Sequence, residues 1–267
     1  MPHPRYRQVS IDNTPYYHCV SRCVRRAFLC GADPVPGFNF EHRRQWIVDR
    51  IKLLCSVFGV ELCAYAVMSN HYHIVLKINV DQVMQWSDKE VARRWMQIFN
   101  GNLLVHQYLM KAELTKADLK FVASTITTWR QRLCDLSWFM RCLNEPIARM
   151  ANSEDHCTGR FWEGRFKSQA LLDERALLAC MAYVDLNPIR ASMAKTLEDS
   201  DYTSVQERIN HPGTDYLKPF KEQAENSIPF KLNDYLELVD WGGRQVKRNK
   251  RGYIPASVPP ILTLRTP

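Results

Sequence analysis

The segment 71–78, with the sequence HYHIVLKI, carries two histidines separated by one residue. Side chains two positions apart on a β-strand point to the same face, so this segment predicts one apolar face and one face with both imidazoles. The predicted apolar face consists of Tyr72, Ile74, Leu76 and Ile78. Two neighbouring imidazoles beside a turn can bind a divalent metal ion. A short H-x-H pattern is also common among ordinary polar residues, and the pair alone leaves that alternative open.

A tyrosine in the segment 173–190, DERALLACMAYVDLNPIR, is a second candidate. At about 100° per residue, Leu177, Met181 and Val184 form an apolar stripe on a helix. Tyr183 lies off that stripe among alanines, and Asn187 presents its amide on the same side one turn later. A phenol is a weak nucleophile unless a metal ion or a positioned substrate meets it, so an ordinary surface tyrosine is the alternative.

The segment 159–169, GRFWEGRFKSQ, alternates cations with aromatic rings. That composition is typical of surfaces that follow a nucleic-acid backbone and stack on its bases, although a core aromatic cluster with charged neighbours would look the same. The whole chain has a formal net charge of +8 and a pI near 9.0. The run RQVKRNKR (244–251) contains five Lys or Arg and no acid. Such runs suit a polyanion, and a solvated basic face is the alternative.

The elements that position these residues follow from periodicity and turn signals. The predicted strands cover 16–24, 61–68, 71–78 and 161–172, and a two-residue hairpin turn joins the second to the third. The predicted helices cover 41–58, a helical block from 87 to 150, 173–187 and 232–239. Pro146 and Pro188 are expected to end or kink the helices that reach them. This order predicts an α+β fold, in which helices pack on an antiparallel sheet.

Composition excludes several other classes of protein. Hydrophobic residues make up 46% and charged residues 24% of the 267 residues, as in globular proteins rather than disordered chains. No run approaches the roughly 20 apolar residues of a membrane span, and the first residues contain no apolar signal region. The nine cysteines include no C-x-x-C pair, which predicts small buried hydrophobes in a reducing cytosol rather than a structural zinc site.

Three motifs, NHYH (70–73), RFWEGRFKSQ (160–169) and AYVDLNPIRA (182–191), together resemble the single-tyrosine HUH transposases. The chain resembles most the branch of REP-associated tyrosine transposases, over residues 16–79 and 137–193. The resemblance implies a ferredoxin-like HUH core within a domain of residues 1–200, which contains a helical insertion at about 87–136. It also implies a basic C-terminal extension at 201–267, and a bacterial, nucleoid-associated protein of the cytoplasm.

The same resemblance implies an activity and the residues that perform it. A DNA transposase of this kind cleaves and rejoins single-stranded, hairpin-bearing DNA, such as REP-like repeats, through a 5′-phosphotyrosine. Tyr183 matches the nucleophile, and His71 and His73 match the metal-binding histidines. Asn187 matches the residue that completes the metal site. The implied metal is Mg²⁺ or Mn²⁺, whereas imidazoles alone also suit zinc or copper.

The implied partner is single-stranded DNA, and no membrane is involved. The active protein would be a monomer, or a homodimer in which each chain donates its Tyr183 to the other. Basic residues after the first strand, in the segment 159–169 and in the run 244–251 are expected to contact the DNA. These are Arg22, Arg25, Arg26, Arg160, Arg165, Lys167, Arg244, Lys247, Arg248, Lys250 and Arg251.

Other function classes share some of these features. Relaxases and replication initiators also use paired histidines, but they usually add a helicase or a larger metal cluster, and the sequence contains no GxxxxGK[ST] motif. A nucleic-acid-binding protein that does not cut DNA would keep the basic residues without the chemistry. A zinc hydrolase would need a third His, Cys or carboxylate ligand, for which the sequence offers no clear candidate.

Overall fold

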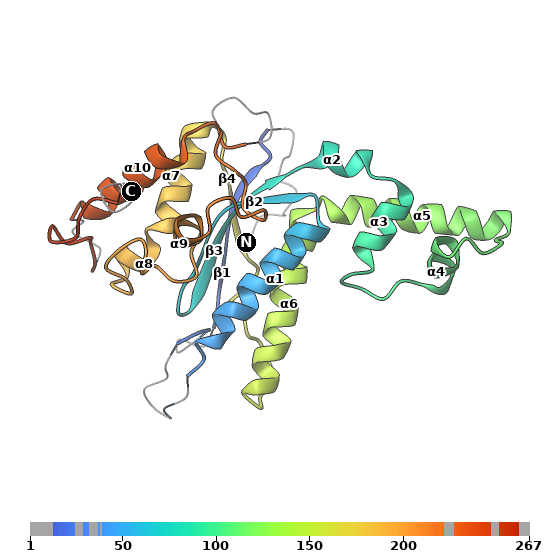
Figure 1. Ribbon diagram of the computed structural model, residues 1–267. Coiled ribbons are helices and arrows are strands. Elements are labelled where there is room, and N and C mark those ends of the chain that lie inside the picture. The colour runs from blue at the N-terminus through green and yellow to red at the C-terminus, as the bar shows by residue number, and fades with distance from the viewer. Residues whose placement is uncertain are drawn as a thin grey trace.

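The chain folds around one four-stranded antiparallel sheet (Figure 1). This computed structural model describes residues 13–24, 29–31, 37, 39–221, 227–246 and 251–261. The strands are β1 (Tyr16–Arg22), β2 (Val60–Val67), β3 (His71–Ile78) and β4 (Lys167–Ala170), in the order β2-β3-β1-β4. Helices cover both faces of the sheet, so the predicted α+β class is confirmed.

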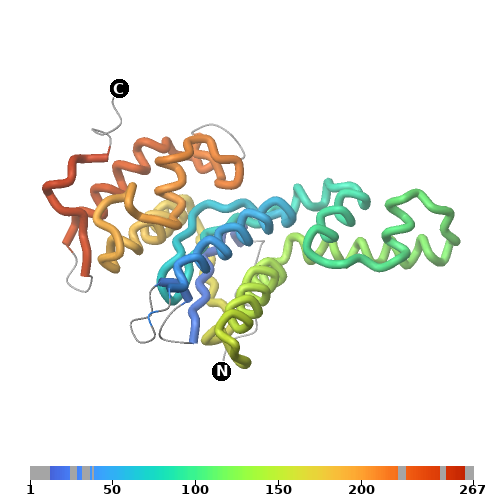
Figure 2. Tube along the Cα trace, turned by 60° about the horizontal axis from the view of Figure 1, so that its bottom comes forward, coloured from blue at the N-terminus to red at the C-terminus, as the bar shows by residue number. Residues whose placement is uncertain are grey.

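The first face of the sheet packs against α1 (His42–Val57) and α6 (Leu136–Glu154), which lie side by side (Figure 2). The predicted apolar face of β3 points into this layer, where all four of its residues are buried. Ile51 and Leu54 of α1 and Phe139 of α6 are buried in the same core. The prediction of which β3 side chains face this core is therefore confirmed.

Pro146 lies inside α6, and the helix continues through it to Glu154. A proline at this position has no N–H, so the carbonyl of Cys142, four residues earlier, loses its helical hydrogen bond. The Arg50 guanidinium on α1 takes that place, because its Nε donates to the Cys142 carbonyl at 2.9 Å. Of the two expectations for Pro146, that it would end or kink the helix, the first is wrong, because α6 continues and a neighbouring helix supplies the missing donor.

The second face of the sheet is covered by α7 (Glu174–Asp185), α8 (Asn187–Arg190), α9 (Ser204–Asn210) and α10 (Leu232–Arg244). The predicted stripe of α7, formed by Leu177, Met181 and Val184, is buried against this face. Residues beyond 200 join the same core, including Val205, Leu236 and Val239. The C-terminal segment therefore helps to build the layer that holds α7 on the sheet.

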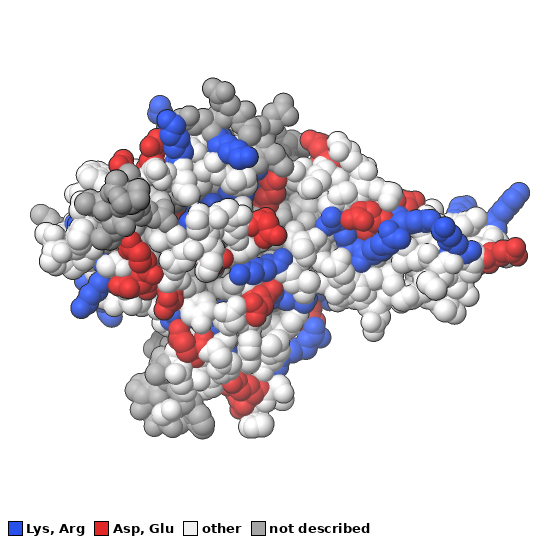
Figure 3. All heavy atoms as spheres, viewed as in Figure 1, with Lys and Arg blue, Asp and Glu red and all other residues white. Residues whose placement is uncertain are grey.

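Four helices form an arm that stands away from the sheet in both views (Figures 1 and 2). They are α2 (Val80–Gln85), α3 (Asp88–Trp95), α4 (Leu103–Leu109) and α5 (Lys116–Leu133). The rings of Trp95 and Trp129 stack with centroids 5.5 Å apart, next to the buried Val91 and Ile126. On the face shown in Figure 3, Lys and Arg side chains run along this arm. The segment predicted as a helical insertion, at about 87–136, is helical in the structure, and the arm begins earlier, at Val80.

Two predicted boundaries near α6 and α7 differ from the structure. The strand predicted at 161–172 is limited to β4, because Phe161 and Trp162 do not alternate between faces. Both rings pack on the α6 side, perpendicular to each other at 5.0 Å, and Trp162 Nε1 donates to the Asn144 carbonyl at 2.8 Å. Pro188 lies in the first turn of α8, so the helix predicted to reach Asn187 ends at Asp185 and a short helix follows.

Candidate active site

The two histidines of β3 lie on the face of the sheet that α7 covers. Across the antiparallel ladders, Arg22 is paired with His71, and Val20 is paired with both His73 and Lys167. Paired residues share a face, so the two imidazoles and two cations lie on one side at the end of the sheet where β3 begins. His73 is only 5% exposed, whereas Arg22 and Lys167 are exposed. The predicted pair of imidazoles therefore lies beside two solvent-accessible cations on the same face.

Tyr183 of α7 lies next to this pair. Its ring is perpendicular to the His73 ring, with centroids 5.7 Å apart, and also contacts the edge of His18, with centroids 6.1 Å apart. Tyr183 is 48% exposed, in agreement with its predicted place off the apolar stripe. The phenol and the imidazoles of a single chain thus meet at one surface, although the tyrosine and the histidines are far apart in the sequence.

His18 is a third imidazole at this site, and the sequence did not single it out. It lies on β1 opposite Val75, on the same face as His73 and diagonal to it. Its Nε2 is 2.9 Å from Nδ1 of His73, which is a hydrogen bond. The alternation of YYHCVSR places His18 and Arg22 on one face, but only the pairing of β1 with β3 shows that this face contains the other histidines.

His71 is held by its neighbour in the hairpin. Its Nδ1 is 2.6 Å from Oδ1 of Asn70, and because an amide oxygen only accepts, Nδ1 carries the proton. The lone pair of the neutral ring is then on Nε2. Burial, with a smaller contribution from the charge of Arg22, lowers the pKa of His71 to about 4. Burial also lowers the pKa of His18 to about 4, so both rings are neutral at neutral pH.

Neutral imidazoles with fixed Nδ1 partners are suitable metal ligands. Within the described residues, no group of three or more His, Cys, Asp or Glu is arranged to hold a metal ion. A metal here would therefore need ligands of another kind beside His71 and His73, such as an amide, a water or a phosphate oxygen. This donor set is compatible with Mg²⁺ or Mn²⁺ once substrate phosphate is present. The metal-binding roles remain predictions.

Asn187 begins α8 directly after α7. Its amide nitrogen donates to the carbonyl of Tyr183 at 2.9 Å and approaches that of Val184 at 3.5 Å. The bond to Tyr183 ties the Asn187 side chain to a carbonyl in the last turn of α7. It also fixes the amide group one turn from Tyr183, with its oxygen as the remaining acceptor. The role of Asn187 as a metal ligand stays a prediction.

A buried carboxylate holds the end of α7 that carries Tyr183. Asp185 accepts hydrogen bonds from Ser204 Oγ at 2.5 Å, from the Val205 N–H at 3.0 Å and from the Tyr235 hydroxyl at 2.5 Å. Burial raises the pKa of Asp185 to about 6, although these bonds and the Arg208 guanidinium oppose the shift. One carboxylate thus links α7 to the start of α9 and to α10, two residues from the phenol.

The predicted DNA-contacting residues differ in their surroundings. Arg22 and Lys167 flank the histidines, and Arg160 and Arg165 are exposed in the loop before β4. Arg244 is bound internally, because its guanidinium contacts Asp240 and the carbonyls of Val258 and Pro259. Arg251 is exposed, and its N–H approaches the Arg190 carbonyl at 3.3 Å. Arg25, Arg26, Lys247, Arg248 and Lys250 lie outside the described residues.

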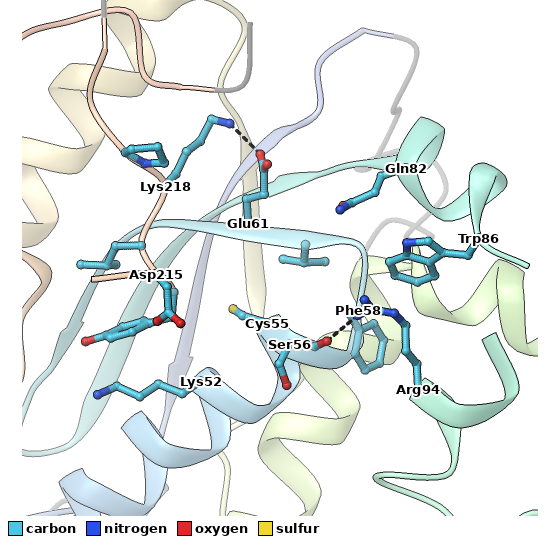
Figure 4. Close-up of a pocket in the computed structure, with 14 residues that line it drawn as sticks. Lys52, Cys55, Ser56, Phe58, Glu61, Gln82, Trp86, Arg94, Asp215 and Lys218 are labelled. Carbon is cyan, nitrogen blue, oxygen red and sulfur yellow. Dashed lines mark hydrogen bonds and ion pairs between the residues drawn. The ribbon is translucent and has the colours of Figure 1, made fainter. Parts of the chain in front are cut away.

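The cavity in Figure 4, with a volume of about 610 Å³, lies at the opposite end of the sheet, between the end of α1, the start of β2 and the arm. Lys218 pairs with Glu61 at 2.7 Å, and Lys52 lies 4.3 Å from the ring centre of Tyr216. Arg94 packs against the Trp86 ring at 4.1 Å. These cations are engaged by neighbouring side chains, and the cavity adds nothing to the histidine site.

Comparisons with known proteins identify no family. No family model and no curated protein matches the sequence. Among solved structures, a REP-associated tyrosine transposase bound to a REP hairpin aligns over 85% of this chain and 97% of that chain, with 11% identity and a TM-score of 0.47. A likeness this distant assigns neither a substrate nor a reaction to this chain. No helix among the described residues is long and apolar enough to cross a membrane.

Proposed function

We propose that this protein is a metal-dependent endonuclease and strand transferase that acts on single-stranded, hairpin-bearing DNA. The observation that carries the proposal is the contact of the Tyr183 ring with His73, at 5.7 Å between centroids, within one chain. A half-exposed phenol beside imidazoles that could hold a metal ion is suited to attack on a phosphodiester. The sequence motifs around these three residues independently suggest the same activity.

Tyr183 is the proposed nucleophile. Its oxygen would form a bond to the phosphorus as the bond from phosphorus to the 3′ oxygen breaks. The phenol loses its proton, the 3′ oxygen gains one, and the products are a 5′-phosphotyrosine and a 3′-hydroxyl. Because one phosphodiester is exchanged for another, a second 3′-hydroxyl can reverse the step and join new ends without ATP.

His71 and His73 are the proposed protein ligands of a divalent cation, with Asn187 as a further oxygen ligand. Bound there, Mg²⁺ or Mn²⁺ would polarise the scissile phosphate and neutralise its developing charge. Arg22 and Lys167 lie in adjacent rows on the same face, where they can bind the phosphates on either side. These two cations favour a negatively charged DNA strand, lying across this end of the sheet, as the substrate. A neutral substrate would not be attracted to them.

The substrate proposed for this site is single-stranded DNA rather than a duplex. The phenol and the histidines lie where α7 meets the sheet. The loop before β4 carries the exposed Arg160 and Arg165 together with the part-buried Trp162 and Phe166, whose rings pack on the α6 side. Aromatic and cationic side chains in one loop suit unstacked bases with their phosphates. All three site residues come from one chain, so a monomer would be sufficient to assemble the site.

The test is a labelled single strand that carries a hairpin and a flanking segment, incubated with Mg²⁺ or Mn²⁺ and resolved on a denaturing gel. Wild-type protein should give a cut strand and a covalent protein–DNA adduct, both of which a chelator should abolish. Tyr183→Phe should lose both products and keep its binding to the strand. Tyr253→Phe is the matched control, because Tyr253 is equally exposed, at 48%, and should behave as wild type.

Two results would reject the proposal. An adduct that survives in Tyr183→Phe would show that another residue attacks the phosphate. Binding without any metal-dependent product in the wild-type protein would favour the alternative of a nucleic-acid-binding protein that does not cut.

A further inference from the structure

The hydrogen bond between His18 and His73 has a geometry that restricts what each ring can do. The two ring planes differ by only 12°, and the centroids are 5.1 Å apart. Nε2 of His18 is 2.9 Å from Nδ1 of His73. The separation of the centroids equals this distance plus the distance from each ring centre to its own nitrogen. The rings therefore lie end to end in nearly one plane, with both nitrogens pointing at each other.

One proton lies between the two nitrogens, and its position decides the state of His73. If His18 donates it, Nδ1 of neutral His73 is the acceptor and Nε2 of His73 carries a proton. If His73 donates it, Nδ1 carries the proton and Nε2 has the lone pair. Only the second tautomer can bind a metal ion through Nε2. His71 already has that tautomer, because its Nδ1 donates to Asn70.

We propose that His18 is a positioning residue, which accepts a hydrogen bond from Nδ1 of His73 and so holds the Nε2 lone pair of His73 ready for the divalent cation. This inference rests on the proposed function, because it deepens the role of the same site. It assigns to His18 the part that Asn70 plays for His71. The two β3 histidines would then be fixed in matching tautomers by two neighbours from different elements.

The geometry argues against His18 as a third metal ligand. A cation bound by both His18 Nε2 and His73 Nδ1 would have to lie between two nitrogens that are only 2.9 Å apart and point at each other. Metal–nitrogen bonds of about 2.0 Å need more room along that line. The described residues also contain no three-ligand group of His, Cys, Asp or Glu that could hold a metal. His18 would therefore act on the cation through His73, as the partner of its Nδ1.

The direct test is the tautomer of His73 in the metal-free, full-length protein. Long-range ¹H–¹⁵N correlation spectra of ¹⁵N-histidine-labelled protein separate protonated from unprotonated ring nitrogens. The chain has eight histidines, and the signals are assigned by single substitutions. We expect Nδ1 of His73 to be protonated and Nε2 to be unprotonated. The opposite tautomer in the wild-type protein overturns the proposal, and the tautomer itself is read in the wild-type protein.

The second test is the affinity for Mn²⁺ alone, measured by titration calorimetry. His18→Ala should bind Mn²⁺ about 10–100-fold more weakly than wild type, as is usual when the hydrogen-bond partner of a metal ligand is removed. His18→Gln should bind close to wild type, because its amide oxygen can accept the same hydrogen bond. His42→Ala is the matched control, since it removes another imidazole that contacts an aromatic ring, Trp46, away from the site.

The outcomes separate the two proposals. Wild-type affinity in His18→Ala overturns the role of His18 while leaving the proposed function intact. Equal losses of Mn²⁺ affinity in His18→Ala and His18→Gln also overturn it, because they would show that His18 acts through packing and not as a hydrogen-bond acceptor. If the wild-type protein binds no Mn²⁺ and cuts no DNA, the proposed function fails, and the tautomer of His73 still decides whether His18 fixes this ring.

Discussion

Asp185 provides the sharpest test of how the fold holds Tyr183. Its buried carboxylate accepts hydrogen bonds from Ser204, from the Val205 N–H and from the Tyr235 hydroxyl. Asp185→Ala would leave these donors without their acceptor, at the junction of α7, α9 and α10. We expect a large loss of stability and, in the protein that remains folded, a looser attachment of the helix that carries the phenol.

The size of the loss follows from the donors one by one. The Ser204 hydroxyl can turn to the Tyr65 carbonyl, which it already approaches at 3.4 Å, so its loss is small. Within the part of the chain that the structure describes, the Val205 N–H and the Tyr235 hydroxyl have no such second acceptor, and a buried donor left without a partner costs about 1–3 kcal/mol. Burial already raises the pKa of Asp185 to about 6, so the wild-type carboxylate is itself costly at neutral pH. The net loss should therefore be about 3 kcal/mol, out of a total of about 5–15 kcal/mol.

Urea unfolding followed by circular dichroism measures this loss, and a double-mutant cycle assigns it. Asp185→Ala should cost about 1 kcal/mol less in a Tyr235→Phe background, because that background lacks the hydroxyl that would be left buried. Asp201→Ala is the control, since Asp201 is an exposed acceptor for Gln206 and should change stability by less than about 0.5 kcal/mol. A loss below about 1 kcal/mol in Asp185→Ala, or additive effects in the cycle, would refute the reasoning.

Two further predictions concern the core. Arg50→Met should lower the free energy of unfolding by about 1–3 kcal/mol, because the Cys142 carbonyl loses its donor. Pro146→Ala in the same protein should restore most of this loss, because alanine returns the helical N–H. Thermal unfolding of the single and double variants measures both effects, and a double variant that shows no rescue would contradict this role of Arg50. Burial raises the pKa of Cys63 to about 12, so above about pH 9 the unfolded chain releases a proton that the folded chain keeps. Stability should then fall as the pH rises from 9 to 11, and Cys63→Ala should reduce this slope; equal slopes in urea titrations would argue against it.

Much of the fold could be predicted because local periodicity and burial agree. The alternation in β3 assigned its apolar side chains to one face, and the spacing of Leu177, Met181 and Val184 assigned the buried side of α7. Both patterns arise from side chains that must leave water, which is the strongest signal in a sequence. The position of Tyr183 off the stripe followed from the same spacing, and its exposure agrees.

Features that depend on a distant partner could not be predicted. Pro146 reads as a helix terminator, and only the position of Arg50 on a neighbouring helix explains why α6 continues. The pair Phe161 and Trp162 reads as strand, but the indole donates to the Asn144 carbonyl and both rings turn to one side. In each case, a tertiary hydrogen bond overrides the local preference.

His18 shows why the site itself was only partly predictable. Its place beside His73 depends on the register of β1 against β3, in which His18 pairs with Val75. A shift of one residue would turn His18 to the opposite face and bring Tyr17 and Cys19 toward α7. Those two side chains are fully buried in the core under α1 and α6, so burial on one face fixes the imidazole on the other. The arrangement of the histidines is therefore a consequence of apolar packing across the sheet, and enlarging Cys19 to Phe should disturb the His18–His73 hydrogen bond without touching either ring.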